Sequence, residues 1–307
     1  MANSGKYLHP FTDWGFKRLF GSEVNKDLLI DFLNQLLPSH HQIQDLNFAR
    51  NEQVGRNEYD RRAIFDLFCV SPSGERFIVE MQKAKQAYFK DRSVFYATFP
   101  ISEQAPQGDW DYKLEPVYLV GILDFVFDED KDDSRVMHCV QLKDQINRVF
   151  YDKLMFIYLE MPKFTKTEAE LETLTDKWLY VLKHLPELTD RPAKLQERVF
   201  SRLFELAEIG KFNRTERALY EESLKVYRDL TNVIGTSFIE GKVEGIEEGK
   251  EIGRAEGVEI GRAEGVEIGE RKKALETARK ALRKNLSVDD IAEMTGLTEA
   301  EIEALRE

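Results

Sequence analysis

The chain has 307 residues, of which 42% are hydrophobic, enough for one large domain with appended segments and incompatible with an intrinsically disordered protein. Its two cysteines, Cys69 and Cys139, lie in apolar runs without metal or redox spacing, so a disulfide framework is not expected. The formal net charge of −12 argues at face value against nucleic acid. However, residues 240–270 hold ten acids against four bases, which is half of the excess, and Arg and Lys cluster at 50–62 and 83–92.

The N-terminus predicts an unanchored protein. It reads MANSGKYLHPF, without the basic and apolar regions of a signal peptide, and no apolar run approaches the length of a membrane span. We therefore expect no membrane partner and a cytoplasmic location.

Helix and strand patterns alternate over the first half of the chain. Apolar spacing predicts a helix over 22–37, with Ser22 as N-cap and Pro38 beyond its end. A strand-like segment follows at 43–49, then the polar stretch 50–62, a hairpin at 64–82 and a helix over 82–99. Further strands are predicted at 115–127, 135–142 and 149–161. This mixture favours an α/β layer architecture for residues 1–165.

The second half is predicted to be helical. Amphipathic patterns at 168–185, 195–209 and 214–234 indicate an all-helical extension over 166–235. The octapeptide EIGRAEGV then occurs twice, at 251–258 and 259–266, and glycine recurs every fourth residue from Gly241 to Gly269. Each glycine costs a helix about 1 kcal/mol relative to alanine. We therefore expect a mobile, partly helical spacer over 236–270, in preference to a functional motif.

The final segment, 271–307, has helix-turn-helix spacing. Ser287 and Thr298 are predicted helix caps on either side of a Thr-Gly-Leu turn. The second helix carries Glu299, Glu301 and Glu303, which would repel phosphates. Packing or self-association, with a homo-oligomer formed through the C-terminal helices, is therefore favoured over DNA contact.

Two acids interrupt the apolar runs of the hairpin IFDLFCVSPSGERFIVEMQ, residues 64–82. A turn centred on Ser73 places Asp66 opposite Glu80, on one face with Ile64, Phe68 and Ile78, whereas Phe65 falls on the other face with Leu67 and Cys69. Opposed carboxylates within about 5 Å repel each other. A shared proton, an arginine or a divalent cation would offset the repulsion, and the cation would do so best. The plainer alternative is an edge strand with a half-exposed Glu80.

These residues resemble a known motif. An Asp on one strand and Glu-x-Gln on the next is similar to the PD-(D/E)XK nuclease motif. The segments LHPFTDWGFKRLFG, IVEMQ, RSVFY, YKLEPVYLVGIL and the glycine-glutamate tail together resemble the Rpn-type recombination-promoting nucleases, also called PD-(D/E)XK family transposases. The resemblance implies a restriction-endonuclease-like core with a mixed central sheet flanked by helices. It also implies DNA as substrate, Mg²⁺ or Mn²⁺ as cofactor, and Asp66 and Glu80 as metal ligands.

Gln82 completes the implied catalytic set, although many relatives have Lys at this position. Glutamine orients water but supplies no charge or proton. In a helix over 82–99, Lys85, Phe89, Arg92 and Tyr96 would share one face, so Lys85 or Arg92 could replace the missing charge. For Phe89, packing in the hydrophobic core is a better interpretation than a role in the site. Arg61, Arg62 and Tyr96 are candidate substrate contacts, and Asp13, Glu23, Glu52 and Glu58 are candidates for a further upstream acid.

The sequence therefore predicts a metal-dependent DNA endonuclease linked to recombination, mobile-element or defence biology. The alternative is a catalytically degenerate nuclease fold that acts as a binding or assembly module. No phosphate-binding glycine loop, zinc spacing or Gly-x-Ser-x-Gly elbow indicates a rival chemistry.

Overall fold

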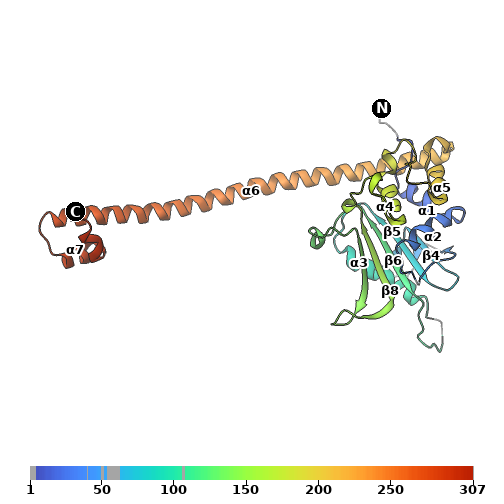
Figure 1. Ribbon diagram of the computed structural model, residues 1–307, viewed down its shortest axis with the longest axis horizontal. Helices are drawn as coiled ribbons and strands as arrows, with labels where there is room; N and C mark the ends of the chain where they lie inside the picture. Colours follow the sequence, from blue (N-terminus) through green and yellow to red (C-terminus); the bar gives the residue numbers. More distant parts are fainter. Residues whose placement is uncertain (1–4, 40, 50–51, 54–62, 106–107, 307) are drawn as a thin grey trace. The chain divides into compact units, whose positions relative to one another are not determined.

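A mixed six-stranded sheet, in the order β1-β4-β5-β6-β8-β7, forms the centre of the computed structural model, which describes residues 5–39, 41–49, 52–53, 63–105 and 108–306 (Figure 1). β5–β6 and β6–β8 are parallel, whereas β1–β4, β4–β5 and β7–β8 are antiparallel. The short strands β2 and β3 pair separately. The strands are β1 (Asn47–Phe48), β2 (Glu52–Gln53), β3 (Ala63–Ile64), β4 (Leu67–Val70), β5 (Arg76–Gln82), β6 (Val117–Leu123), β7 (Met137–Lys143) and β8 (Val149–Glu160).

Helices cover both faces of the sheet. The larger core lies between one face and α1, α2, α4, α5 and the first turns of α6, and the smaller core lies between the other face and α3. Strand β6 runs between the two cores, so every one of its residues is buried and the strand is apolar throughout. The helices are α1 (Asp13–Phe20), α2 (Lys26–Asn34), α3 (Phe89–Ser102), α4 (Leu174–His184), α5 (Arg198–Ala207), α6 (Arg214–Leu282), α7 (Val288–Thr295) and α8 (Glu299–Glu303).

Six single-turn 3₁₀ helices complete the described secondary structure. They are η1 (Glu23–Asn25), η2 (Asp128–Asp130), η3 (Met161–Lys163), η4 (Glu168–Glu170), η5 (Leu185–Glu187) and η6 (Ile209–Lys211).

The larger core is centred on Trp178 of α4. Its ring is fully buried and lies 5.1 to 5.9 Å, between centroids, from the rings of Phe20, Phe32 and Phe200. Its indole Nε1 donates to Oδ1 of Asp31 at 2.6 Å, which satisfies the one polar atom of the ring. The predicted helical extension therefore shares a core with the α/β layer.

The predicted α/β class and the mixed sheet flanked by helices are confirmed. Two helix boundaries were predicted wrongly. Over 22–37 the chain first forms η1, and α2 begins only at Lys26, without a side-chain cap from Ser22. The helix predicted over 82–99 begins at Phe89, because β5 continues to Gln82 and Tyr88 adopts a left-handed conformation with φ of 62°.

The glycine repeat is also more regular than predicted. Helix α6 continues without interruption through 236–270, where a partly helical spacer was expected. The glycines from Gly241 to Gly269 have open space around them, and the intervening residues are largely Glu, Ala, Arg and Lys, which have high helix propensity. These helix-forming residues outnumber the glycines. No helix in the described ranges is long and apolar enough to cross a membrane.

The chain divides into two compact units, residues 1–233 (unit 1) and 234–307 (unit 2). In unit 2 the end of α6 packs with α7 and α8 around Ala278, Ala281, Ile291 and Ile302. Ser287 and Thr298 accept hydrogen bonds from the backbone of the first helical turns, so both predicted caps are confirmed.

Candidate functional site

The β4–β5 hairpin has the predicted register. Leu67 pairs with Val79 and Phe68 with Ile78, which brings Asp66 to the position opposite Glu80. The two acids are linked through backbone groups: the Asp66 N–H donates to Oε1 of Glu80 at 3.2 Å, and the Met81 N–H donates to Oδ2 of Asp66 at 2.7 Å. Both carboxylates therefore lie at the carboxyl end of β5.

One predicted detail of the hairpin is wrong. Ile64 is 64% exposed, and Phe65 packs against Phe68, at 5.5 Å between ring centroids, in the smaller core instead of joining Leu67 in the larger one. The strand is interrupted between β3 and β4, at residues 65–66, so the two-residue alternation of faces is lost there. The interruption turns the Asp66 N–H toward the Glu80 carboxylate.

Burial and nearby negative charge raise the pKa values of both acids. Glu80 is 3% exposed, and its burial, followed by the charge of Asp66, raises its pKa to about 8, although Arg92 opposes the change. Burial also raises the pKa of Asp66, and Asp13 adds to the effect. At neutral pH the pair therefore retains a proton that a bound cation would displace.

Gln82 and Arg92 both contact Glu80. Nε2 of Gln82 donates to Oε2 of Glu80 at 3.2 Å, and Nη2 of Arg92 lies 3.4 Å from the same oxygen. The Arg92 guanidinium also lies 5.2 Å from the ring centroid of Tyr96, which is itself packed edge-on against Phe65. Helix α3 thus places one guanidinium group, that of Arg92, beside the acidic pair.

Lys85 does not join them. Because α3 begins at Phe89, Lys85 is in the preceding loop and forms an ion pair with Asp128, so the predicted helical face does not include it. Phe89 is buried in the smaller core, as expected. Arg61 and Arg62 lie outside the described residues.

Among the four candidate upstream acids, Asp13 interacts electrostatically with the pair. It is the first residue of α1, and its charge raises the pKa of Asp66. Glu23 instead accepts from the Phe48 N–H, Glu52 pairs with Ile64 in the small ladder, and Glu58 lies outside the described residues.

Sequence reasoning did not include Lys83 or the start of α6 in the site. Lys83 follows the end of β5 and interacts electrostatically with Asp13 and Asp66. Its burial lowers its pKa. Its ammonium lies 5.4 Å from the ring centroid of Tyr227 in α6. Because Lys83 is no longer in the strand, strand alternation does not determine its direction, and the distant Tyr227 carries no sequence signal.

Tyr227 belongs to a small polar cluster at this edge. Its hydroxyl donates to Oδ2 of Asp124 at 3.4 Å, and its ring lies 4.3 Å from that of His9. The Asp124 N–H donates to the carbonyl of Gln82 at 2.8 Å. Helix α6 is therefore tied to the strand that carries Glu80.

The donor set fits a hard divalent cation. Asp66 and Glu80 offer carboxylate oxygens, which Mg²⁺ and Mn²⁺ prefer. Glu80 pairs across the parallel ladder with Gly121, where an added Cβ would lie 3.0 Å from the ring of Tyr158. Within the described ranges no three His, Cys, Asp or Glu side chains form a metal-binding cluster, so an ion held here would complete its shell with water and substrate oxygens.

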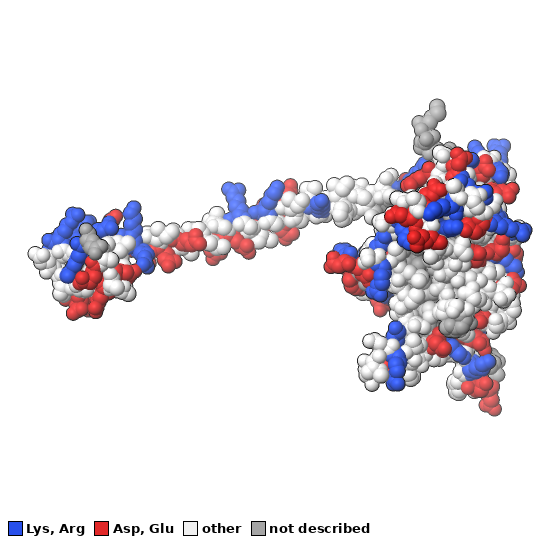
Figure 2. All heavy atoms as spheres, viewed as in Figure 1, with Lys and Arg blue, Asp and Glu red and all other residues white. Residues whose placement is uncertain are grey.

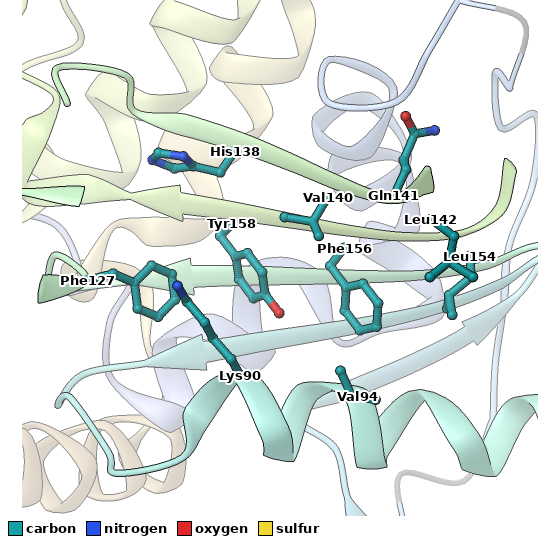
Figure 3. A pocket seen from close by; sticks show the side chains of 10 residues that line it. All are labelled: Lys90, Val94, Phe127, His138, Val140, Gln141, Leu142, Leu154, Phe156 and Tyr158. Atoms are coloured by element: carbon teal, nitrogen blue, oxygen red, sulfur yellow. The ribbon is translucent and has the colours of Figure 1, made fainter. Parts of the chain in front are cut away.

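A separate pocket of about 440 Å³ lies between α3 and the β7–β8 hairpin (Figure 3). Val140, Leu142, Leu154 and Phe156 make much of its lining apolar, with Lys90 and His138 as its basic groups. Neither acid of the pair lines it, so it has no part in the site.

The comparison with known proteins agrees with this arrangement. No curated protein and no solved structure gives a significant match. A family profile described as PD-(D/E)XK nuclease family transposase matches residues 10–237, which contain the hairpin, Asp13 and Tyr227. Proteins of the PD-(D/E)XK nuclease type generally use divalent metal ions. Since the match covers well over half of its residues, the chain belongs to the PD-(D/E)XK nuclease family transposases, and its function is of the nuclease type.

Proposed function

We propose that the chain is a Mg²⁺-dependent DNA endonuclease that hydrolyses phosphodiester bonds at the Asp66–Glu80 pair. The observation that carries the proposal is the opposition of these two acids, linked by the Asp66 N–H bond to Glu80, in a buried setting that raises both pKa values. A buried like-charge pair is destabilising by itself, so its presence is best explained by a ligand that neutralises it. A bound divalent ion would lower the pKa of water and stabilise charge on the scissile phosphate.

The neighbouring side chains would act on water and phosphate. Gln82, held by its bond to Glu80, would orient the attacking water through its amide. Arg92 stands beside Glu80, and Lys83 interacts with Asp66, so both would supply the positive charge that glutamine lacks. Asp13 would add a negative charge on the α1 side of the pair.

DNA contacts would extend from this edge. Arg61, Arg62 and Tyr96 remain predicted substrate contacts, and Tyr96 also holds the Arg92 guanidinium. The resemblance and the family description support a role in recombination, mobile-element or defence biology.

Plasmid nicking provides the test. The full chain should nick supercoiled plasmid with Mg²⁺ and not with EDTA, and Asp66→Asn and Glu80→Gln should abolish nicking while leaving the fold intact. Glu103→Gln, which neutralises an exposed acid at the end of α3, is the matched control and should keep full activity. Nicking by Asp66→Asn at the unmodified rate would reject the assignment.

The second candidate function is a degenerate nuclease fold that binds DNA without cleaving it. The presence of glutamine at position 82, where many relatives have lysine, favours this second function. It predicts DNA binding without nicking under any divalent ion, and an unchanged affinity in Asp66→Asn.

A further inference from the structure

The last turns of α6 and the turn that follows them carry a concentration of positive charge. Residues 271–284 contain seven Lys or Arg and a single acid, Glu276, directly after the acidic stretch 240–270. All seven bases are exposed. Figure 2 shows Lys and Arg gathered on one side of unit 2 and Asp and Glu on another.

Four of these bases share one face of the helix, and two more follow in the turn after Leu282. At 100° per residue, Ala274, Ala278 and Ala281 point toward α7 and α8, and the side chains of this set are buried or half-buried in the small core. The four helical bases, Lys272, Lys273, Arg279 and Lys280, point the opposite way, centred about 190° from the core face by the same count. Together with Arg283 and Lys284, they make up what we call the basic face.

The bases of the basic face have no acidic partner among the described residues. Arg271, outside this set, pairs with Glu301 of α8, whereas none of the six bases forms an ion pair with an acid in the described part of the chain. Burial of a core does not explain them either, since all six are exposed. Arg279 and Lys280 lie in the last turn of α6, where the negative end of the helix dipole favours them. Lys272 and Lys273 lie about two turns earlier, where the dipole has little effect and like charges repel each other.

The basic face also continues into a hollow. A depression of about 650 Å³ at the end of α6 is lined by three arginines, Arg279, Arg283 and Arg306, by Asn285, and by Leu282, Leu286 and Leu305. Arg306 also forms an ion pair with Glu303, whereas the other two arginines belong to the basic face. Guanidinium groups bind phosphate through paired hydrogen bonds, so this lining suits a phosphate group.

We propose that the basic face is a phosphate-backbone binding site for DNA, separate from the acidic pair of unit 1. Its helical part, residues 272–282, is about 15 Å long at 1.5 Å per residue, and Arg283 and Lys284 follow it in the next turn. This length matches several successive phosphates of a duplex. The acids of α7 and α8, including Glu299 and Glu303, restrict the approach of DNA to the α6 side. The choice of DNA among polyanions rests on the proposed nuclease function.

Such a site would act as a tether. A second DNA contact on the same chain raises the effective concentration of DNA at the first, without any new contact at the reacting phosphate. The rival occupant of the basic face is the acidic stretch 240–270 of a second copy, which has complementary charge.

Salt-dependent DNA binding tests the proposal in EDTA, so that cleavage plays no part. The affinity of the full chain for a fluorescein-labelled 30-base-pair duplex of arbitrary sequence is measured by anisotropy between 50 and 200 mM salt. The test variant is Arg279→Gln/Lys280→Gln/Arg283→Gln. Its control is Lys250→Gln/Arg254→Gln/Arg262→Gln, which makes the same charge change on exposed positions of the same helix. Glutamine is a good helix former, and a charge-conserving Arg279→Lys/Arg283→Lys variant guards against loss of structure.

The test variant should have a shallower salt dependence. If each of the three bases meets one phosphate, the slope of log affinity against log salt falls by about 2.7, so the unmodified chain loses about 40-fold more affinity than the variant over the fourfold salt range. The control and the lysine variant should keep the original slope. Equal slopes for the test and control variants would overturn the proposal. So would a change in sedimentation mass of DNA-free protein on neutralising the basic face, which would assign it to a second copy. If the test and control variants differ in slope but the unmodified chain never nicks plasmid, the DNA-binding site is supported and only the proposed nuclease function is rejected.

Discussion

Replacing Glu80 by glutamine tests whether this acid serves to bind a metal ion or to stabilise the fold. In the protein without divalent ions, Glu80 is buried against Asp66, and its pKa of about 8 compares with 4.5 for the unperturbed group. The proton is therefore bound more tightly in the folded state than in the unfolded state. The corresponding stabilisation is complete below pH 4.5 and is lost as the pH rises to about 8.

The magnitude follows from these two values. At about 1.4 kcal/mol per tenfold change in proton affinity, holding Glu80 in place costs the metal-free protein roughly 3 kcal/mol at pH 7 and roughly 5 kcal/mol above pH 8. In Glu80→Gln the side-chain oxygen still accepts from the Asp66 N–H, but one acceptor for Gln82 or Arg92 is lost, at about 1 kcal/mol. The variant should therefore be more stable than the unmodified chain by about 2 kcal/mol at pH 7, or roughly 4 to 8 °C in Tm for a unit of this size.

Tryptophan fluorescence provides the assay. All three tryptophans, Trp14, Trp110 and Trp178, lie in unit 1, so their emission reports the melting of that unit alone. Melting curves are recorded in EDTA from pH 5 to pH 8, with Glu103→Gln as control. The advantage of Glu80→Gln should be near zero at pH 5 and grow with pH, and added Mg²⁺ should raise the Tm of the unmodified chain only. A variant less stable than the unmodified chain at pH 8 in EDTA would refute the reasoning, because it would show Glu80 to be a structural partner of Arg92 and Gln82.

Three further outcomes test the site and its boundaries. Gln82→Lys should keep or raise the nicking rate with Mg²⁺, since it restores the charge of many relatives, and complete loss of activity would show that the amide is required. Lys83→Gln should lower the nicking rate by about 100-fold, the lower end of the range for loss of a single charge-stabilising group, with little change in Tm; unaltered nicking would exclude Lys83 from the site. A chain ending at Thr236 should fold and nick, because unit 1 ends at Val233 and the family match at 237; an aggregated product would show that the rest of α6 supports the fold.

The glycine repeat shows where local reasoning was insufficient. Counted singly, glycines from Gly241 to Gly269 disfavour a helix, and an interrupted segment was expected. Helix formation is cooperative, however, and each residue added to an existing helix needs no new nucleus. The first turns of α6 are anchored to unit 1 through Tyr220, whose hydroxyl accepts from the His9 N–H at 3.0 Å, so a nucleus is present at one end.

The sequence by itself determined what depends on neighbours along the chain. The turn around Ser73 set the register that opposes Asp66 and Glu80, and the caps Ser287 and Thr298 set the last two helices, because turn and cap geometry involve only a few adjacent residues. Only the tertiary structure decided what surrounds the acidic pair. Asp13, Arg92 and Tyr227 reach this edge from three helices on both faces of the sheet, and Lys83 turns toward Asp66 only because the strand has ended. Such contacts depend on the packing of whole elements against a shared core, so no short-range pattern in the sequence specifies them.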